Sequence, residues 1–389
     1  MNRIRGWMAL LIAAVLLAGL AGCGEAPEMP EGEPAAETAP ASTPSAVATP
    51  RFESGMIPPA IVIPTVTPDA APAASPDAAS ATELPDAVTI AMIAKSSTNP
   101  VFLSARTGAE AAARELSERH GVTITIDWRT PPTEDGQVQA QRIAQAVNEG
   151  ADAILISSSD AAKVTGAIND AVARGVPVMT FDSDVPESAR FAFYGVDDIQ
   201  TGQAVMRELA GQLGGAGRIA ILAGNQNAPN LRRRVQGVEQ EAANHSGIEI
   251  VGVFYHAETP QDAAAEVLRV MNAYPDIDGW AMIGGWPLFT TTLLTDLNPE
   301  EVKVVSVDAL PAELPYIEAG IAPVLLAQPT YLWGYVSVEK IIDKLMGRDV
   351  PEMNRMELVR VTRENLGEWA RQLRDWGFED VPEQYLQME

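Results

Sequence analysis

Polar and aromatic side chains gather directly after the apolar runs that the sequence predicts to be β-strands. They are Lys95, Asn99, Phe102, Ser157, Asp182, Asp184, Arg232, Trp286, Asp308 and Gln328. Carboxylate, amide and guanidinium groups form hydrogen bonds with hydroxyl groups, and an aromatic face covers the apolar side of a ring. This combination of residue types is typical of a binding site for a small polyol.

Several of these residues also have a purely structural interpretation. Asp182, Asp184 and Asp308 fit solvated turn carboxylates, which are common. Arg232 begins a run of three arginines that fits a solvated helix face, and Trp286 fits a core residue. Their common position after strands favours a shared site, because ligands of parallel sheets bind beyond the carboxyl ends of the strands.

Asp182 and Asp308 raise the alternative of an enzyme, since two carboxylates at a suitable separation hydrolyse glycosides. No second catalytic signal accompanies them, because the sequence has no Gly-x-Ser-x-Gly elbow and no phosphate-binding loop ending in Gly-Lys-Ser/Thr. The histidines, His120, His245 and His256, lack the spacing of metal ligands. We therefore expect binding without catalysis, with no cofactor and no metal site.

Two series of alternating strands and helices have to position these residues. The expected strands are 88–94, 122–128, 153–157, 176–181, 190–194, 218–222, 248–255, 279–283, 302–307 and 324–327, and the expected helices are 102–119, 134–148, 161–174, 230–244, 260–273, 289–297, 312–319 and 331–346. Strands that are apolar on both faces and alternate with helices predict parallel sheets covered on both sides. The series restarts near residue 218, so we expect an α/β protein with two doubly wound lobes.

The start of the chain predicts export. Arg3 and Arg5 precede an apolar run, and Leu20-Ala21-Gly22-Cys23 follows it. This ending resembles the bacterial lipobox, in which the cysteine is acylated, so residues 1–23 are predicted to be a signal peptide and Cys23 the lipidation site. Residues 24–86 are rich in Pro, Ala and Glu and show no helical or strand period, which predicts a disordered tether.

The composition excludes other chemistry. Cys23 is the only cysteine, so an acylated protein would have no thiol left for disulfides or zinc. The formal net charge of −25 argues against nucleic acid as a partner and against direct electrostatic attachment to a membrane. We expect contact with the membrane only through the lipid.

Four segments resemble the sugar-binding branch of the type I periplasmic binding proteins, especially the ribose-, rhamnose- and autoinducer-2-binding proteins. They are residues 98–102, 175–184, 194–198 and 305–308. The resemblance implies two lobes joined by a hinge. The N-terminal lobe would comprise residues 87–195 and 329–348, and the C-terminal lobe 196–328 and 349–389.

The resemblance also implies roles for single residues. Asn99 and Phe102 fall where the family contacts and stacks on its sugar, and Asp182 falls at the main carboxylate of the N-terminal lobe. Arg232 falls at the family's C-lobe arginine, and Asp308 and Gln328 fall at late contacts near the hinge. Lys95 and Asp184 look more like the rhamnose and autoinducer-2 relatives. Ser157 and Trp286 depart from the ribose pattern, which leaves the ligand open.

The function implied is that of an extracytoplasmic solute-binding lipoprotein of an ABC importer. Its partners would be a sugar, an ABC permease and the ATPase of that permease, and the protein would be a monomer anchored to the cell membrane. A ligand-binding sensor of the same fold is the alternative.

Overall fold

The computed structural model describes residues 83–388. Cys23, the predicted signal peptide and nearly all of the predicted tether therefore lie outside the described residues. Within the part of the chain that is described, no helix has the length and apolar character needed to cross a bilayer.

The first lobe is built on a parallel sheet whose strands are buried on both faces. Its order is β2-β1-β3-β4-β5-β11, and all neighbouring pairs are parallel. The strands are β1 (Ala87–Ile93), β2 (Thr123–Trp128), β3 (Ala153–Ile156), β4 (Val178–Phe181), β5 (Ala192–Gly195) and β11 (Met353–Arg355). Every residue of β3 and β4 is buried, which reflects this double coverage, as the sequence predicted.

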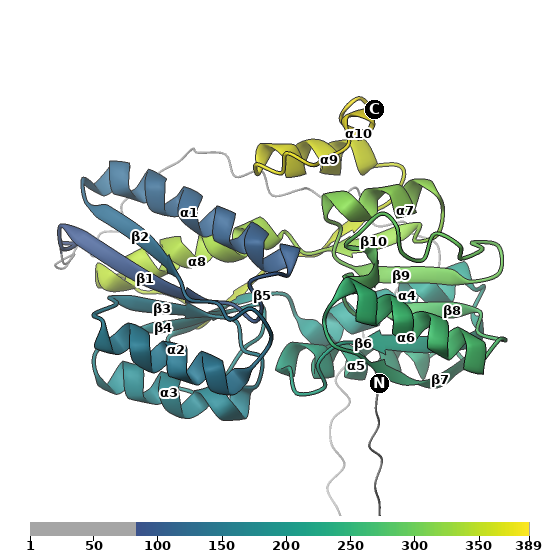
Figure 1. Ribbon diagram of the computed structural model, residues 1–389, viewed down its shortest axis with the longest axis horizontal. Helices are drawn as coiled ribbons and strands as arrows, with labels where there is room; N and C mark the ends of the chain where they lie inside the picture. Colours follow the sequence, from purple (N-terminus) through teal and green to yellow (C-terminus); the bar gives the residue numbers. More distant parts are fainter. Residues whose placement is uncertain (1–82, 389) are drawn as a thin grey trace, which may run out of the picture. The chain divides into compact units, whose positions relative to one another are not determined.

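Four helices cover the first sheet (Figure 1): α1 (Pro100–His120), α2 (Gly136–Asn148), α3 (Ala161–Ala173) and α8 (Thr330–Leu345). Alternate residues of β1 pack on opposite sides: Ile90 lies in the core shared with α1 and α8, and Ile93 lies in the core shared with α2 and α3. Side chains fix the helix starts, since Asn99 caps α1 and Asp160 caps α3.

The second lobe repeats this plan. Its sheet has the order β7-β6-β8-β9-β10-β12, and only β12 runs antiparallel to its neighbour. The strands are β6 (Ala216–Ala223), β7 (Gly247–Tyr255), β8 (Gly279–Met282), β9 (Lys303–Val307), β10 (Val324–Ala327) and β12 (Val359–Val361), and the helices are α4 (Asp198–Gln212), α5 (Pro229–Ala242), α6 (Pro260–Ala273), α7 (Leu314–Glu318), α9 (Leu366–Asp375) and α10 (Glu383–Leu386). In Figure 1 the first lobe is mostly blue and teal, with α8 in yellow-green, and the second lobe is mostly green, with α9 and α10 in yellow.

Glycines bring α4 and α5 unusually close together. A Cβ atom added to Gly202 of α4 would lie 2.0 Å from the carbonyl oxygen of Arg234, and one added to Gly237 of α5 would lie 2.1 Å from that of Ile199. Any larger residue at either position would force the helices apart. This contact fixes the position of α5, which carries residues of the candidate site.

One expected helix is absent. Residues 289–297 form turns after a short 3-10 helix (Trp286–Leu288) instead of an α-helix, so that expectation was wrong. Thr290 accepts from the backbone N–H of Thr292, a local bond that competes with helical bonding. The carbonyl groups of Thr290 and Leu293 accept instead from the hydroxyl of Tyr316.

The chain passes three times between the two sheets: between β5 and α4, between β10 and α8, and between β11 and β12. The third passage lies later than the boundary expected at residue 349. The reason is that β11 adds to the edge of the first sheet beside β5, so residues 353–355 belong to the N-terminal lobe.

Candidate ligand-binding site

Asp182 lies at the carboxyl end of β4 and is held by side chains from both lobes. It is only 3% exposed, and its φ of 55° places it in the left-handed region, which is uncommon for residues other than glycine. Its Oδ2 accepts from Ser157 Oγ at 2.7 Å, and its Oδ1 accepts from Asn230 Nδ2 at 3.0 Å. Ser157 thus supports the carboxylate from within the first lobe, while Asn230 reaches it from α5.

Asp308 occupies the corresponding position after β9. Its φ is 76°, and it is 5% exposed. Its Oδ1 accepts from Gln328 Nε2 at 2.9 Å, and its Oδ2 accepts from the backbone N–H of Gly285 at 3.3 Å. Burial raises the pKa of Asp308, although the Arg234 guanidinium opposes this effect.

The arginine of the site is Arg234, not Arg232. Arg234 is 2% exposed and donates to Asp198 Oδ1 at 3.0 Å and to Gln328 Oε1 at 2.8 Å, with Asp182 Oδ1 at 3.8 Å. Arg232 is exposed, which corrects the sequence assignment. Two residues separate the arginines by roughly 200° around the helix. Arg234 instead shares a face with Asn230, one turn earlier.

Aromatic rings close the apolar side of the site. Phe102 stacks with Trp333 of α8 at 6.1 Å between centroids and makes an edge contact with Phe181 at 6.4 Å. Trp286 donates its indole N–H to Glu258 Oε2 at 3.2 Å, and its ring meets the His256 ring edge-on at 4.9 Å. Trp333 is 1% exposed, and its N–H has no hydrogen-bond partner among residues 83–388.

A buried charge cluster of Lys95, Glu134 and Glu258 joins the lobes. Lys95 Nζ lies 3.5 Å from Glu134 Oε1 in its own lobe and 3.5 Å from Glu258 Oε2 in the other lobe. Burial by itself would lower the pKa of Lys95, but the two carboxylates raise it above its usual range. Burial and the neighbouring Glu258 raise the pKa of Glu134. Burial also acts to raise the pKa of Glu258, but Lys95 together with hydrogen bonds from Glu134 and the Asn225 backbone lowers it.

Residues from both lobes enclose one small cavity of about 30 Å³. Seven of the ten predicted site residues line it, together with polar and aromatic residues that the sequence analysis missed. The seven are Lys95, Asn99, Phe102, Asp182, Trp286, Asp308 and Gln328, and the additional residues include Asn230, Arg234, Glu258 and Trp333. The carboxyl edges of the two parallel sheets therefore face one shared cavity.

Asp184 is, like Arg232, a predicted site residue that the structure places outside the cavity. Its carboxylate forms a salt bridge with Arg190 and accepts from Thr180, and it does not line the cavity. Asp184 therefore braces the turn after β4. Its partners lie within the first lobe, which gives it a structural role in the conformation of that turn.

A model of the periplasmic binding protein domain matches residues 90–349, and the chain belongs to this family. The ribose import binding protein RbsB of Bacillus subtilis is 23% identical over 263 residues, which cover 67% of this chain and 83% of the relative. The D-ribose/D-allose-binding protein of Pseudomonas aeruginosa is 24% identical and covers 61% of this chain and 76% of the relative.

Solved structures give the same fold. The glucose-galactose binding protein GanP from Geobacillus stearothermophilus is 24% identical, with a TM-score of 0.67 over 72% of this chain and 99% of GanP. XylFII is 26% identical, with a TM-score of 0.65 over 72% of this chain and 99% of XylFII. XylFII is also present in a solved complex with LytSN, which matches with a TM-score of 0.66. The two-lobed fold of this family is the one that the sequence resemblance implied.

Proposed function

We propose that this protein is the extracytoplasmic solute-binding component of an ABC importer and that it binds a monosaccharide or similar small polyol between its lobes. The observation that carries this proposal is the convergence of Asp182, Arg234 and Asp308 on one cavity beside Phe102 and Trp333. Charged groups on both lobes offer hydrogen bonds to hydroxyls, and the aromatic rings offer an apolar face.

Closure of the lobes would follow from this arrangement. Asp182 belongs to the first lobe, whereas Arg234 and Asp308 belong to the second. A ligand that contacts all three stabilises the closed form only, because the open form separates these groups. The ligand hydroxyls would replace hydrogen bonds such as that from Asn230 to Asp182.

The two aspartates act in this proposal as hydrogen-bond acceptors and not as a catalytic pair. Their near neighbours, Asn230, Gln328 and Arg234, are hydrogen-bond donors. Relatives of the chain are named as binding proteins, such as the xylitol-binding protein of Mycolicibacterium smegmatis, which is 24% identical over 51% of this chain. This supports a site that holds its ligand without reaction.

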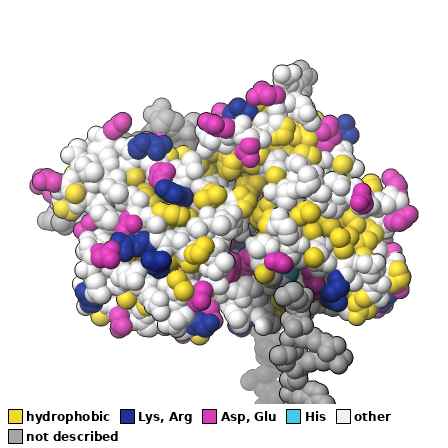
Figure 2. All heavy atoms as spheres, in the orientation of Figure 1, with side chains coloured by type: hydrophobic (Ala, Val, Ile, Leu, Met, Phe, Trp, Pro, Cys, Tyr) yellow, Lys and Arg dark blue, Asp and Glu magenta, His cyan; other side chains and the backbone are white. Residues whose placement is uncertain are grey.

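The proposed partners are a permease and an ATPase, and the proposed anchor is a lipid on Cys23 that holds a monomeric protein at the membrane. Figure 2 shows Lys and Arg side chains in small separate groups on the face drawn. Together with the acidic composition, this supports a proposal without a nucleic-acid partner. Detergent partitioning of a Cys23→Ala variant tests the proposed anchor.

A sensor is the second candidate, and one observation favours it. XylFII, which shares the fold, is present in a solved complex with a second protein, LytSN. A sensor of this class would bind a partner receptor in its ligand-bound state and would not deliver the ligand to a permease.

A thermal-shift screen with pentoses, hexoses, deoxyhexoses, polyols and autoinducer-2 tests the binding function. We expect at least one compound to raise the melting temperature and to bind with a measurable Kd in calorimetric titration. Uptake of that compound by cells with and without the gene then separates importer from sensor. Normal uptake in the deletion strain would exclude the importer role.

A further inference from the structure

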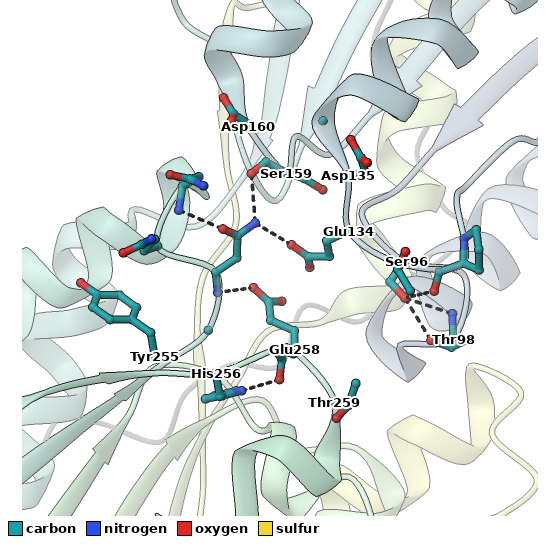
Figure 3. A pocket seen from close by; sticks show the side chains of 18 of the residues that line it. Ser96, Thr98, Glu134, Asp135, Ser159, Asp160, Tyr255, His256, Glu258 and Thr259 are labelled. Carbon is teal, nitrogen blue, oxygen red and sulfur yellow. Dashed lines mark hydrogen bonds between the residues drawn. The ribbon is translucent and has the colours of Figure 1, made fainter. Parts of the chain in front are cut away.

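A second and much larger cavity adjoins the site. It has a volume of about 650 Å³ and is lined by loops of both lobes, with residues 96–98, 132–136 and 159–163 on one side and 224–227 and 255–259 on the other. Figure 3 shows Ser96, Glu134 and Ser159 on the side of the first lobe, facing Tyr255, His256 and Glu258 of the second. This outer cavity is large enough for a second sugar-sized unit.

The outer cavity carries polar groups that the protein itself leaves without partners. Ser159 is only 1% exposed, yet its Oγ has no hydrogen-bond partner within the described chain. The same holds for His256 Nε2, whereas Glu134 Oε1 accepts no hydrogen bond but lies 3.5 Å from Lys95 Nζ. Buried polar atoms without partners are rare, and each calls for an explanation such as a ligand that completes the bonding. Ser159, Glu134 and His256 all belong to residues that line the outer cavity.

The lining also offers a ring surface. Tyr255 ends β7 and is 45% exposed, which is high for a large aromatic residue. It lines the outer cavity beside His256, whose ring packs against Trp286 of the inner site. A second pyranose or furanose ring would therefore find an aromatic face as well as hydrogen-bonding groups.

The boundary between the two cavities is the Lys95–Glu134–Glu258 cluster. Glu258 lines both cavities. The glycine at position 224 leaves room for it, since a Cβ atom there would lie 2.7 Å from Glu258 Oε1. The Lys95 ammonium has three donors, and its two carboxylate partners are both at 3.5 Å, the outer limit of a hydrogen bond. An oxygen that links two sugar units would be a suitable further acceptor.

We propose that the outer cavity is a subsite for the second unit of a glycoside, so that the preferred ligand is a disaccharide or another sugar bearing a hydroxyl-rich substituent. One ring would occupy the site around Asp182 and Asp308. The linkage would pass Lys95 and Glu258, and the second ring would lie against Tyr255 and Ser159. This inference rests on the proposed function, because it requires that the inner site binds a sugar ring.

Calorimetric titration tests the subsite with matched pairs: D-xylose and xylobiose, D-glucose and cellobiose, and D-galactose and lactose. The chain is used as wild type and as Tyr255→Ala, with Tyr274→Ala as the control, since Tyr274 is exposed but lies outside the outer cavity. We expect one disaccharide to bind at least tenfold more tightly than its monosaccharide. Tyr255→Ala should weaken that disaccharide about two- to tenfold, the range of an aromatic contact, and leave the monosaccharide unchanged.

Ser159→Ala provides a second variant whose fold is not at risk, because the Ser159 hydroxyl makes no bond within the described protein. It should weaken the disaccharide selectively. If monosaccharides bind and no disaccharide binds better, or if both variants leave the disaccharide affinity unchanged, the outer subsite is refuted while the proposed function stands. If no sugar in either set binds the wild-type protein, both proposals fail.

Discussion

Asp182 and Asp308 are equivalent residues of the two lobes. Each directly follows a central strand, β4 or β9, and each has a positive φ, 55° and 76° respectively. Each also donates its backbone N–H to a carbonyl of the neighbouring strand, from Asp182 to Tyr194 and from Asp308 to Leu326. Backbone conformations of this kind persist where the surrounding structure holds them, often at functional sites. Both lobes thus aim a carboxylate into the cleft by the same local geometry.

Asp182→Ala should reduce ligand affinity on the order of a hundredfold or more. Hydrogen bonds to a charged group contribute roughly 1.5–3 kcal/mol each, and about 1.4 kcal/mol is tenfold in affinity. Asp184→Ala is the matched control, because Asp184 bonds to Arg190 within the first lobe. It should lower the melting temperature and leave the Kd near that of the wild type. Calorimetric titration of both variants distinguishes them, and wild-type affinity in Asp182→Ala would remove the centre of the site.

Arg234→Met should abolish tight binding, whereas Arg232→Met should not change it. Arg234 bonds to Asp198 and Gln328 inside the site, but Arg232 is exposed on the same helix. Removal of a buried charge partner is destabilising by roughly 3–5 kcal/mol, so Arg234→Met should also unfold at a lower temperature. Equal affinities of the two folded variants, measured below both melting temperatures, would contradict the assignment.

Trp286→Ala should weaken binding, but less than Asp182→Ala does. The indole is 4% exposed, lines the inner cavity and donates to Glu258, so the substitution removes a ring surface and one donor. Trp286→Phe keeps an aromatic ring but loses the N–H donor and part of the ring surface, so its affinity should lie between those of the wild type and Trp286→Ala. If Trp286 serves only the core, both variants will melt earlier while their Kd stays unchanged.

Affinity should fall as the pH rises toward about 8, the value to which burial and Glu258 raise the pKa of Glu134. Closure buries Glu134 beside Lys95 and Glu258, so the closed form retains a proton that a solvated glutamate, with its usual pKa of 4.5, has lost. Protonated Glu134 therefore stabilises the closed form fully at low pH, and this stabilisation is lost as the pH rises to about 8. Between pH 6 and pH 8 we expect a decrease on the order of tenfold or more.

Glu134→Gln is the control for this pH dependence, since it keeps the shape of the side chain and removes its titration. Its affinity should change much less than that of the wild type from pH 6 to pH 8, and Asp198, whose pKa burial raises to about 7, is common to both proteins. The opposite shift of Glu258, whose pKa is lowered, acts only at more acidic pH and does not interfere with this window. A wild-type Kd that is independent of pH would show that Glu134 does not take up a proton on closure.

Cys23→Ala should prevent acylation and release the protein from the membrane or leave its leader uncleaved. The motif Leu20-Ala21-Gly22-Cys23 motivates this prediction. Phase partitioning in a detergent such as Triton X-114 separates lipidated from unlipidated protein. Retention in the detergent phase of a variant that has lost its leader would contradict the proposed anchor.

The sequence predicted the parts that depend on local chemistry. Runs such as residues 153–157 are apolar at every position but the last, and they became strands buried on both faces. The strand-end rule placed Asp182 and Asp308 at the carboxyl edges of their respective sheets, because ligands of parallel sheets bind there. Asp160 caps α3, a role that is common for Asp at the start of a helix.

The sequence was less informative where three-dimensional packing decides which side chains enter the site. The choice between Arg232 and Arg234 depends on the rotation of α5, which its contact with α4 sets. Glu258 enters the site only because the loops after β1 and β7 meet across the lobes. The spacing of Asn230 and Arg234 by four residues was a usable signal, because such residues share one helix face.

The close contact at Gly202 and Gly237 has a consequence for how ligand preference can evolve. Neither glycine can be enlarged without separating α4 from α5, so α5 cannot slide or tilt to suit a longer or shorter sugar. Natural variants and laboratory libraries should therefore tolerate no change at these two positions. New specificities would have to arise by exchange of side chains in the loops after β7 and β8, where Glu258 and Trp286 lie.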